Sequence, residues 1–270
     1  MKHAIMVIGY GENAGVLQET INVLDDSDID FYIHWDKRWP LPKLTSQYSK
    51  VKLVGKRIAV KWGSFTQVEA EKHLMQVVGS SYDYIHLISA MDMPLMTATY
   101  FKRYFTNDVY VGFSDPEGFE YRLEGYYPNH VDFRKHRLTF KLYRLFNRFF
   151  KVNRLKDNTG FCVHKGPQWF SIKGKYSLEL LNSDLSMFEH SCFPDEEYVQ
   201  SILGRFDTGD YSEDDNAQAA RYIDWHRGGP YVFTDKDIPE LKQLVNTDYA
   251  FARKVKDSKI IELVYNTMSN

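Results

Sequence analysis

Three charged residues in the second half of the chain have side chains suited to group transfer. Glu196 follows Pro194 and Asp195 and precedes an apolar stretch, and a carboxylate in such a place acts as a general base if partial burial raises its pKa. Arg227 and Lys254 lie in aromatic or apolar company, and such cations can neutralise a departing diphosphate without a metal ion. Each residue alone also fits a surface charge or an ion pair, so the assignment depends on context.

A glycine-rich segment follows the first apolar run. Residues 9–15 read Gly-Tyr-Gly-Glu-Asn-Ala-Gly, and Asp36 follows the second apolar run. Glycines at a helix N-terminus and an acid after the next strand imitate a dinucleotide site, but the spacing is one residue longer than in NAD(P) enzymes. Because of this difference in spacing, we keep an NAD(P)-dependent oxidoreductase only as an alternative to a transferase. We favour some nucleotide at this sheet edge, where Gly9, Asp36 and Asp92 would lie.

Asp-x-Asp pairs are the usual means of holding a hard cation against a diphosphate. The chain has three of them, Asp26/Asp28, Asp28/Asp30 and Asp235/Asp237. The first two precede a strand in a polar turn, and the third lies where the pattern predicts the cap and first turn of a helix. We therefore expect capping and turn roles for all three, and no metal site.

Short apolar runs alternate with helical spacing in the first half of the chain, which predicts an α/β fold with a mostly parallel central sheet flanked by helices. The expected strands are 4–8, 30–34, 51–54, 58–60, 82–89, 108–113 and 168–172, and the expected helices include 16–24, 64–78 and a helix around 217–225. Ser64 or Thr66 is the expected cap of the helix over 64–78. No repeat or long linker divides the chain, so we expect a single domain.

The stretch 134–156 contains nine Lys or Arg and no Asp or Glu. Five cations recur every three or four residues, and apolar residues repeat the same steps one position later: Arg137, Lys141, Arg144, Arg148 and Lys151, then Leu138, Leu142, Leu145, Phe149 and Val152. A cationic amphipathic helix is how a peripheral enzyme lies on an anionic leaflet. We expect such a helix over Arg137–Val152, and the alternative is a helix packed on the domain with a solvated basic side.

A series of short motifs resembles the core-2/I-branching β-1,6-N-acetylglucosaminyltransferases, whose relatives include peptide O-xylosyltransferases and bacterial polysaccharide enzymes. The matching pieces are HAIMVIGY, FYIHWDKR, KWGSFTQVEAE, YIHLISAMDMPL, GPQWFSI, FPDEEYVQSIL, AARYIDW and FARK, in that order. The resemblance implies a GT-A-like fold and inverting transfer from a UDP-sugar, with no Asp-x-Asp motif and no required metal. The implied absence of a metal-binding Asp-x-Asp motif agrees with the turn and capping roles expected for the three aspartate pairs.

The same resemblance assigns roles to the charged residues. It implies that Glu196 of the Pro-Asp-Glu motif is the catalytic base, with Glu197 as the adjacent alternative. It implies that Arg227 and Lys254 bind the diphosphate, with Arg221 as a competitor for the first position.

On the nucleotide side, the resemblance implies that Asp36 contacts the uridine and that the backbone from Val7 to Gly9 contacts the uracil. The expected activity is metal-independent transfer of a sugar, GlcNAc in the family, to a glycan or lipid-linked oligosaccharide. Residues 1–113 would form the nucleotide-binding half, and residues 114–270 the acceptor and catalytic half. A non-catalytic carbohydrate- or membrane-binding module is a further alternative.

The composition bears on the partners of the protein and on the compartment in which it works. The net charge of −2 argues against a nucleic-acid partner, and two cysteines cannot form a disulfide framework. No apolar run approaches the roughly 18–20 residues needed to span a bilayer. Eukaryotic members of the family that the chain resembles carry several disulfides and an N-terminal membrane anchor. The resemblance therefore implies a bacterial cytoplasmic enzyme, which we expect to be peripheral on the inner membrane face. Aromatic residues make up 16% of the chain, and Trp169, Tyr121 and Tyr126 are candidates for stacking on sugar rings.

Overall fold

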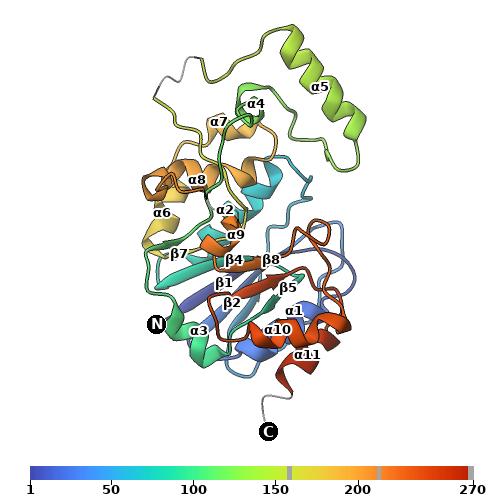
Figure 1. Ribbon diagram of the computed structural model, residues 1–270, viewed down its shortest axis with the longest axis vertical. Coiled ribbons are helices and arrows are strands. Elements are labelled where there is room, and N and C mark those ends of the chain that lie inside the picture. Colours follow the sequence, from blue (N-terminus) through green and yellow to red (C-terminus); the bar gives the residue numbers. More distant parts are fainter. Residues whose placement is uncertain (157–159, 212–213, 267–270) are drawn as a thin grey trace.

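A six-stranded sheet with the order β3-β2-β1-β4-β7-β6 forms the centre of the computed structural model, which describes residues 1–156, 160–211 and 214–266 (Figure 1). The strands are β1 (His3–Gly9), β2 (Ile29–Trp35), β3 (Val51–Leu53), β4 (Tyr84–Ser89), β6 (Val109–Tyr110) and β7 (Ser171–Lys173). Within this sheet β7 runs antiparallel to both neighbours and the other pairs are parallel. The mixed α/β fold with a mostly parallel sheet is therefore confirmed, and β7 carries the sheet across the expected boundary at residue 113.

Helices cover both faces of this sheet (Figure 1). Ala4 and Met6 of β1 pack on one face with α2 (Thr66–Val78) and α6 (Lys175–Asn182), whereas Ile5 and Val7 pack on the other with α1 (Gly15–Leu24) and α3 (Ala98–Tyr104). Burial on both faces explains why β1 is a continuous apolar run rather than an alternating one.

A second, three-stranded sheet lies beside the first, in the order β5 (Asp92–Pro94), β9 (Phe251–Arg253) and β8 (Arg221–Ile223). It packs against α10 (Ile238–Gln243) and α11 (Lys259–Tyr265). The remaining elements are α4 (Tyr121–Glu124), α5 (Arg137–Phe149), α7 (Ser186–Glu189), α8 (Tyr198–Ile202), α9 (Asp215–Gln218) and the 3-10 turns η1 (Pro194–Glu196), η2 (Gly204–Phe206) and η3 (Asp235–Asp237). No helix among the described residues is both long enough and apolar enough to cross a membrane.

Two sequence-based expectations about these elements are wrong. The helix expected around 217–225 is the short α9 followed by strand β8, because the fully buried Arg221 holds the chain there by donating hydrogen bonds to the carbonyls of Leu87 and Phe170. Residues 58–60 form no strand: the backbone N–H of Ile58 bonds the His34 ring, and that of Val60 bonds a carboxylate oxygen.

The helix expected over 64–78 begins at Thr66, and neither expected side chain caps it. Its N-cap residue is Phe65, and the Ser64 hydroxyl instead donates to the Lys61 carbonyl at 2.9 Å. This correction concerns the helix start alone, because the helix ends at Val78 as expected.

Candidate functional site

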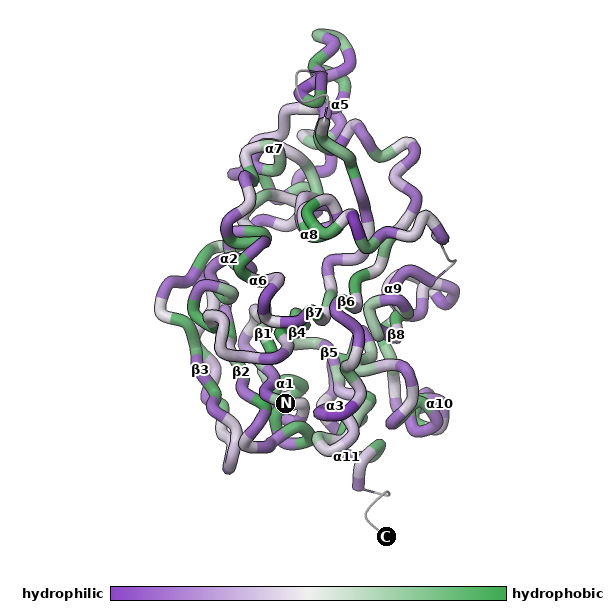
Figure 2. Tube along the Cα trace, turned by 90° about the vertical axis from the view of Figure 1, so that its left-hand side faces the viewer, coloured by the Kyte–Doolittle hydropathy of each residue, from purple (hydrophilic) through white to green (hydrophobic). Residues whose placement is uncertain are grey.

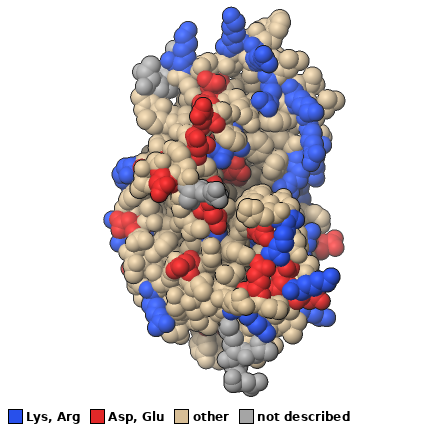
Figure 3. Space-filling model, viewed as in Figure 1, with Lys and Arg blue, Asp and Glu red and all other residues tan. Residues whose placement is uncertain are grey.

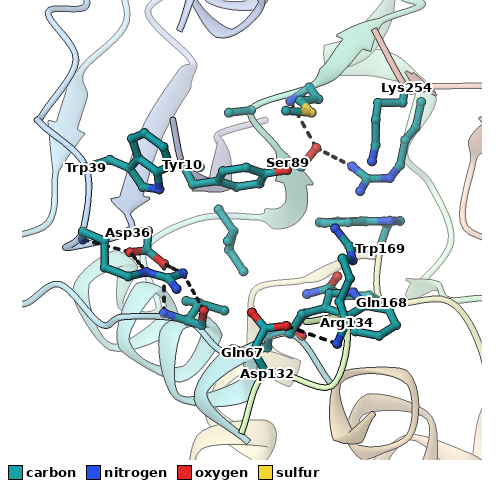
Figure 4. A pocket seen from close by; sticks show the side chains of 18 of the residues that line it. Tyr10, Asp36, Trp39, Gln67, Ser89, Asp132, Arg134, Gln168, Trp169 and Lys254 are labelled. Atoms are coloured by element: carbon teal, nitrogen blue, oxygen red, sulfur yellow. Dashed lines mark hydrogen bonds and ion pairs between the residues drawn. The ribbon is translucent and has the colours of Figure 1, made fainter. Parts of the chain in front are cut away.

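A cavity of about 470 Å³ opens at the carboxyl ends of β1, β2 and β4 (Figure 4). Ligands of open α/β sheets bind at this edge, because the loops that follow the parallel strands converge there. The lining residues come from seven segments of the chain: Ile8, Gly9, Tyr10 and Asn13; Asp36, Arg38 and Trp39; Val60, Trp62 and Gln67; Ser89, Ala90 and Met91; Asp132, Arg134 and Lys135; Gln168 and Trp169; Arg253 and Lys254.

The end of β1 reaches this cavity through Ile8 and Gly9, whereas Val7 is fully buried in the core beneath it. A Cβ atom at Gly9 would lie 2.2 Å from the Trp35 ring, so only glycine lets that ring pack against the strand. The Trp35 indole N–H in turn donates to the Gly11 carbonyl at 3.2 Å. The close packing fixes the backbone that faces the cavity.

Asp36, at the end of β2, is nearly buried and accepts four hydrogen bonds. Three come from the backbone and side chain of Arg38, and one comes from the backbone N–H of Val60 at 2.9 Å. Burial opposes ionisation, but these donors, led by the Arg38 side chain, lower the pKa of the carboxyl group. Asp36 therefore stays ionised and holds Arg38 against the cavity wall.

Lys254 and its neighbour Arg253 reach the same cavity from the end of β9. Arg253 donates to Asp92 at 2.7 Å and to the Ser89 hydroxyl, and its guanidinium carbon lies 4.4 Å from the centre of the Trp169 ring. Burial, helped by the charge of Arg253, lowers the pKa of the Lys254 ammonium group to about 8. A bound anion at this point would favour the charged form of the lysine.

Cations outnumber carboxylates along the cavity. Arg38, Arg134, Lys135, Arg253 and Lys254 line it, against Asp36 and Asp132. An enclosed site lined by one sign of charge concentrates ligands of the opposite sign. The cavity is therefore suited to an anion such as a diphosphate.

Arg227 is not brought to this cavity. Its guanidinium group pairs with Asp237 at 2.7 Å, with Glu240 at 2.8 Å and with Asp224, and it stacks 4.2 Å from the centre of the Tyr231 ring. Its competitor in the sequence, Arg221, is also outside the cavity lining and is bonded to backbone carbonyls.

Glu196 is the last residue of η1. Its side chain is 37% exposed, and Oε2 accepts a hydrogen bond of 2.7 Å from Arg122. The residue is not among those that line the cavity, but its neighbour Asp195 accepts a bond of 2.9 Å from Gln67, which does line it. The bond between Asp195 and Gln67 thus connects η1 to the cavity wall.

Glu197, the alternative base, has a different environment. It is fully buried, and among the described residues neither of its carboxyl oxygens has a hydrogen-bond partner. Burial raises the pKa of this group well above its usual value, which favours its protonated form. The geometry favours Glu196, which is exposed, over Glu197 as the group that meets an acceptor.

Two glutamines of the cavity wall are held from behind by buried carboxyl groups. Gln67 donates to Asp195 at 2.9 Å, and Gln168 donates to Glu71 at 2.7 Å. Burial raises the pKa of Asp195 to about 7 and that of Glu71 to about 8. The Tyr198 hydroxyl completes the Glu71 cluster at 2.5 Å.

Rings suited to stacking also surround the cavity. Trp169, one of the three stacking candidates, lines it together with Tyr10, Trp39 and Trp62, which no sequence pattern marked as stacking residues. Figure 4 shows Tyr10 and Trp39 near Asp36, and Trp169 near Lys254. The other two stacking candidates, Tyr121 and Tyr126, lie outside the cavity lining, packed on Arg144 and His190 respectively.

The Asp-x-Asp pairs have the turn and capping roles that the sequence predicts, apart from Asp30, which lies in β2 and accepts from the Tyr82 hydroxyl and the Lys50 backbone N–H. Asp26 accepts the Asp28 backbone N–H and pairs with Lys102 at 2.8 Å, and Asp237 forms a capping box with Thr234. None of these aspartates lines the cavity. Within residues 1–156, 160–211 and 214–266, no three His, Cys, Asp or Glu residues are grouped to hold a metal ion.

Comparison with known proteins identifies the class to which this fold and cavity belong. The model of the Core-2/I-Branching enzyme family matches residues 4–244, most of the chain. The chain therefore belongs to the Core-2/I-Branching enzyme family, which is a family of glycosyltransferases, and this confirms the resemblance. The family implies a nucleotide-sugar donor and a glycan acceptor and gives no support to an NAD(P)-dependent oxidoreductase. No curated protein matches the chain. The matched residues include Glu196 and end before Arg253 and Lys254.

Proposed function

We propose that this glycosyltransferase has a GT-A-like fold and transfers a sugar with inversion from a UDP-sugar, UDP-GlcNAc in the first instance, without a metal ion. The acceptor is a glycan or a lipid-linked oligosaccharide. The observation that carries the proposal is the cationic, aromatic cavity at the strand ends, with Arg253 and Lys254 on its wall and with Gln67 of the wall bonded to Asp195, the neighbour of Glu196.

The nucleotide would lie along the wall formed by the ends of β1 and β2. Backbone groups around Gly9 are open to the cavity there, and Tyr10 and Trp39 offer flat rings to a base. Asp36 has its oxygens occupied by Arg38 and Val60, so its part is to fix Arg38 and the shape of the uridine site.

The diphosphate would lie against Arg253 and Lys254. As the bond between the anomeric carbon and the diphosphate oxygen breaks, its electron pair leaves with UDP, and these two cations stabilise the growing negative charge. In metal-dependent enzymes a divalent cation supplies this charge. We assign the role to Arg253 rather than Arg227 because Arg227 is held by three carboxylates away from the cavity.

Glu196 would act as the general base. Its Oε2 is bonded to Arg122, whereas Oε1 accepts no hydrogen bond from any described residue. A free oxygen can take the proton of an acceptor hydroxyl while that hydroxyl oxygen attacks the anomeric carbon from the face opposite UDP. Arg122 contacts the rings of Phe119 and Phe193 and would orient the carboxylate.

A donor screen in the presence of excess chelator tests the proposal. We expect UDP and one UDP-sugar to raise the melting temperature, and that UDP-sugar to be hydrolysed slowly, with and without chelator. GDP, CDP and NADH are the matched comparisons and should have little effect. Activity that disappears in chelator and returns with manganese would contradict metal independence, and stabilisation by GDP or CDP instead of UDP would contradict the nucleotide.

A further inference from the structure

Helix α5 leaves an apolar face uncovered. Leu138, Leu142, Leu145 and Phe149 are 72%, 58%, 65% and 77% exposed, and their spacing places them along one side of the helix. Phe146 and Phe150 extend this face, with their rings 4.5 Å apart. Single exposed leucines are normal on protein surfaces, but a continuous apolar patch marks an interaction site.

The opposite side of α5 fixes its orientation. Asn147 is buried and exchanges two hydrogen bonds with the backbone of Tyr126, at 3.1 and 3.2 Å. The Phe140 ring lies 5.2 Å from that of Phe133 and 5.8 Å from that of Tyr127. The helix therefore presents its leucines outward as part of the fold.

A row of cations runs beside the apolar face. Among the described residues, no carboxylate forms an ion pair with Arg137, Lys141, Arg144 or Arg148. Figure 3 shows Lys and Arg gathered along the edge of the molecule where Figure 1 places α5. Figure 2 shows hydrophobic and hydrophilic residues alternating along α5. Three of the cations, with Lys151, also line a groove of about 650 Å³ between α5 and the segment around α4. That groove offers phosphate groups a basic wall.

We propose that α5 docks on an anionic phospholipid bilayer, with its leucines and phenylalanines in the boundary between headgroups and acyl chains and its cations on the lipid phosphates. Helices that lie in this plane combine an apolar face with a basic one. A second copy of the chain is a poorer occupant, because a two-fold interface would bring the cation row near its own copy. The 13-residue helix is about 20 Å long, too short to span and well suited to lie flat.

The docking site is close to the cavity along the chain. Arg134 and Lys135 line the cavity, and α5 begins two residues later, at Arg137. A protein docked through α5 would therefore hold this cavity near the membrane surface, where a lipid-borne acceptor is found. This consequence rests on the proposed sugar transfer, whereas the docking itself does not.

The test is co-sedimentation of the full chain with vesicles, without donor or acceptor, so that its outcome is independent of activity. We expect binding to vesicles of phosphatidylcholine mixed with phosphatidylglycerol at low salt, much less binding to phosphatidylcholine alone, and release as salt rises. Arg137→Glu/Arg148→Glu should lower the affinity at least about tenfold, since each cation near an anionic leaflet contributes roughly a fivefold factor. Leu138→Gln/Phe149→Gln should lower it by a similar factor at low salt, because these side chains would no longer bury in the interface.

The matched control is Lys236→Glu/Lys259→Glu, which makes the same change in net charge with two exposed lysines of η3 and α11, at the other end of the molecule (Figure 1). It should bind like the wild type, and circular dichroism and melting temperature should be unchanged in all variants. Absence of binding to anionic vesicles at low salt, or equal binding by Leu138→Gln/Phe149→Gln, would overturn the proposal. A dimer that Leu138→Gln/Phe149→Gln dissociates, without vesicle binding, would assign the face to a second copy instead.

Discussion

The guanidinium group of Arg253 lies over the Trp169 ring, with 4.4 Å between its central carbon and the ring centre. The same group donates to Asp92 at 2.7 Å. Stacking on one side and an ion pair on the other fix the orientation of the cation before any ligand binds, and a group oriented in advance loses little conformational freedom on binding.

The first prediction concerns the pair that we assign to the diphosphate. Arg253→Ala and Lys254→Ala should each weaken UDP binding by about 1.5–3 kcal/mol, the contribution of a hydrogen bond to a charged group. Isothermal titration calorimetry in excess chelator measures this directly.

Arg227→Ala is the matched comparison, because it removes an arginine held by carboxylates outside the cavity. It should leave the UDP affinity within about twofold and lower the melting temperature, since three carboxylates lose their common partner. A loss of UDP affinity with Arg227→Ala that equals the loss with Arg253→Ala would return Arg227 to the diphosphate site.

The central sheet is predictable from the sequence because its strands are buried on both faces, which makes β1 and β4 predominantly apolar. The wrong expectations concern short segments whose conformation depends on hydrogen bonds between backbone groups and distant side chains. Residues 58–60 bond to His34 and Asp36 instead of a strand, and β8 depends on the buried Arg221. No local pattern contains such contacts, because the partners lie far away along the chain.

The site is only partly predictable for the same reason. Gly9, Asp36 and Lys254 line one cavity, as expected for residues that follow strands, but the basic stretch 134–156 reads as one unit in the sequence. The structure divides it: Arg134 and Lys135 line the cavity, the four cations from Arg137 to Arg148 belong to α5, and the last three follow that helix. The acids that hold Arg227 come partly from positions 237 and 240, which adjoin it only after folding.

The second prediction separates the two adjacent glutamates. Glu196→Gln should lower the transfer rate by roughly 10²–10⁴-fold and leave UDP-sugar binding nearly unchanged, because the amide has the shape of the carboxylate and cannot take a proton. Initial rates with a UDP-sugar and its acceptor measure the effect, and calorimetry checks binding.

Glu197→Gln serves as the internal control. The Glu197 carboxyl is buried, and burial raises its pKa, so a neutral amide of the same shape should cost less than about tenfold in rate. The reverse order of the two variants would move the base to Glu197.

The third prediction concerns stability at the buried Glu71. Burial raises the pKa of this carboxyl to about 8, so the folded protein keeps its proton while the unfolded chain releases it near the usual value. The free energy of unfolding should therefore fall between about pH 4.5 and 8, by up to about 1.4 kcal/mol per pH unit from this group. Urea unfolding of wild type and Glu71→Gln at several pH values measures it.

Glu71→Gln keeps an acceptor for Gln168 and a partner for the Tyr198 hydroxyl, so the folded structure should tolerate the substitution. The free energy of unfolding of this variant should fall less steeply with pH than that of the wild type. Relative to the wild type, the variant should therefore become more stable as the pH rises to 8. Parallel pH profiles for the two proteins would show that Glu71 titrates normally.

The last prediction uses the lysine beside Arg253. The Lys254 ammonium has its pKa lowered to about 8 by burial and by the neighbouring charge, and a bound diphosphate favours its protonated form. UDP affinity should therefore be highest below pH 8 and fall as the pH rises through 8, with proton uptake on binding near that pH. Calorimetry in buffers of different ionisation enthalpy measures the uptake.

Lys254→Arg is the control, because arginine stays charged throughout this range. The UDP affinity of this variant should not change between pH 7 and 9. The same fall in wild type and Lys254→Arg would show that another group titrates, and that Lys254 does not contact the diphosphate.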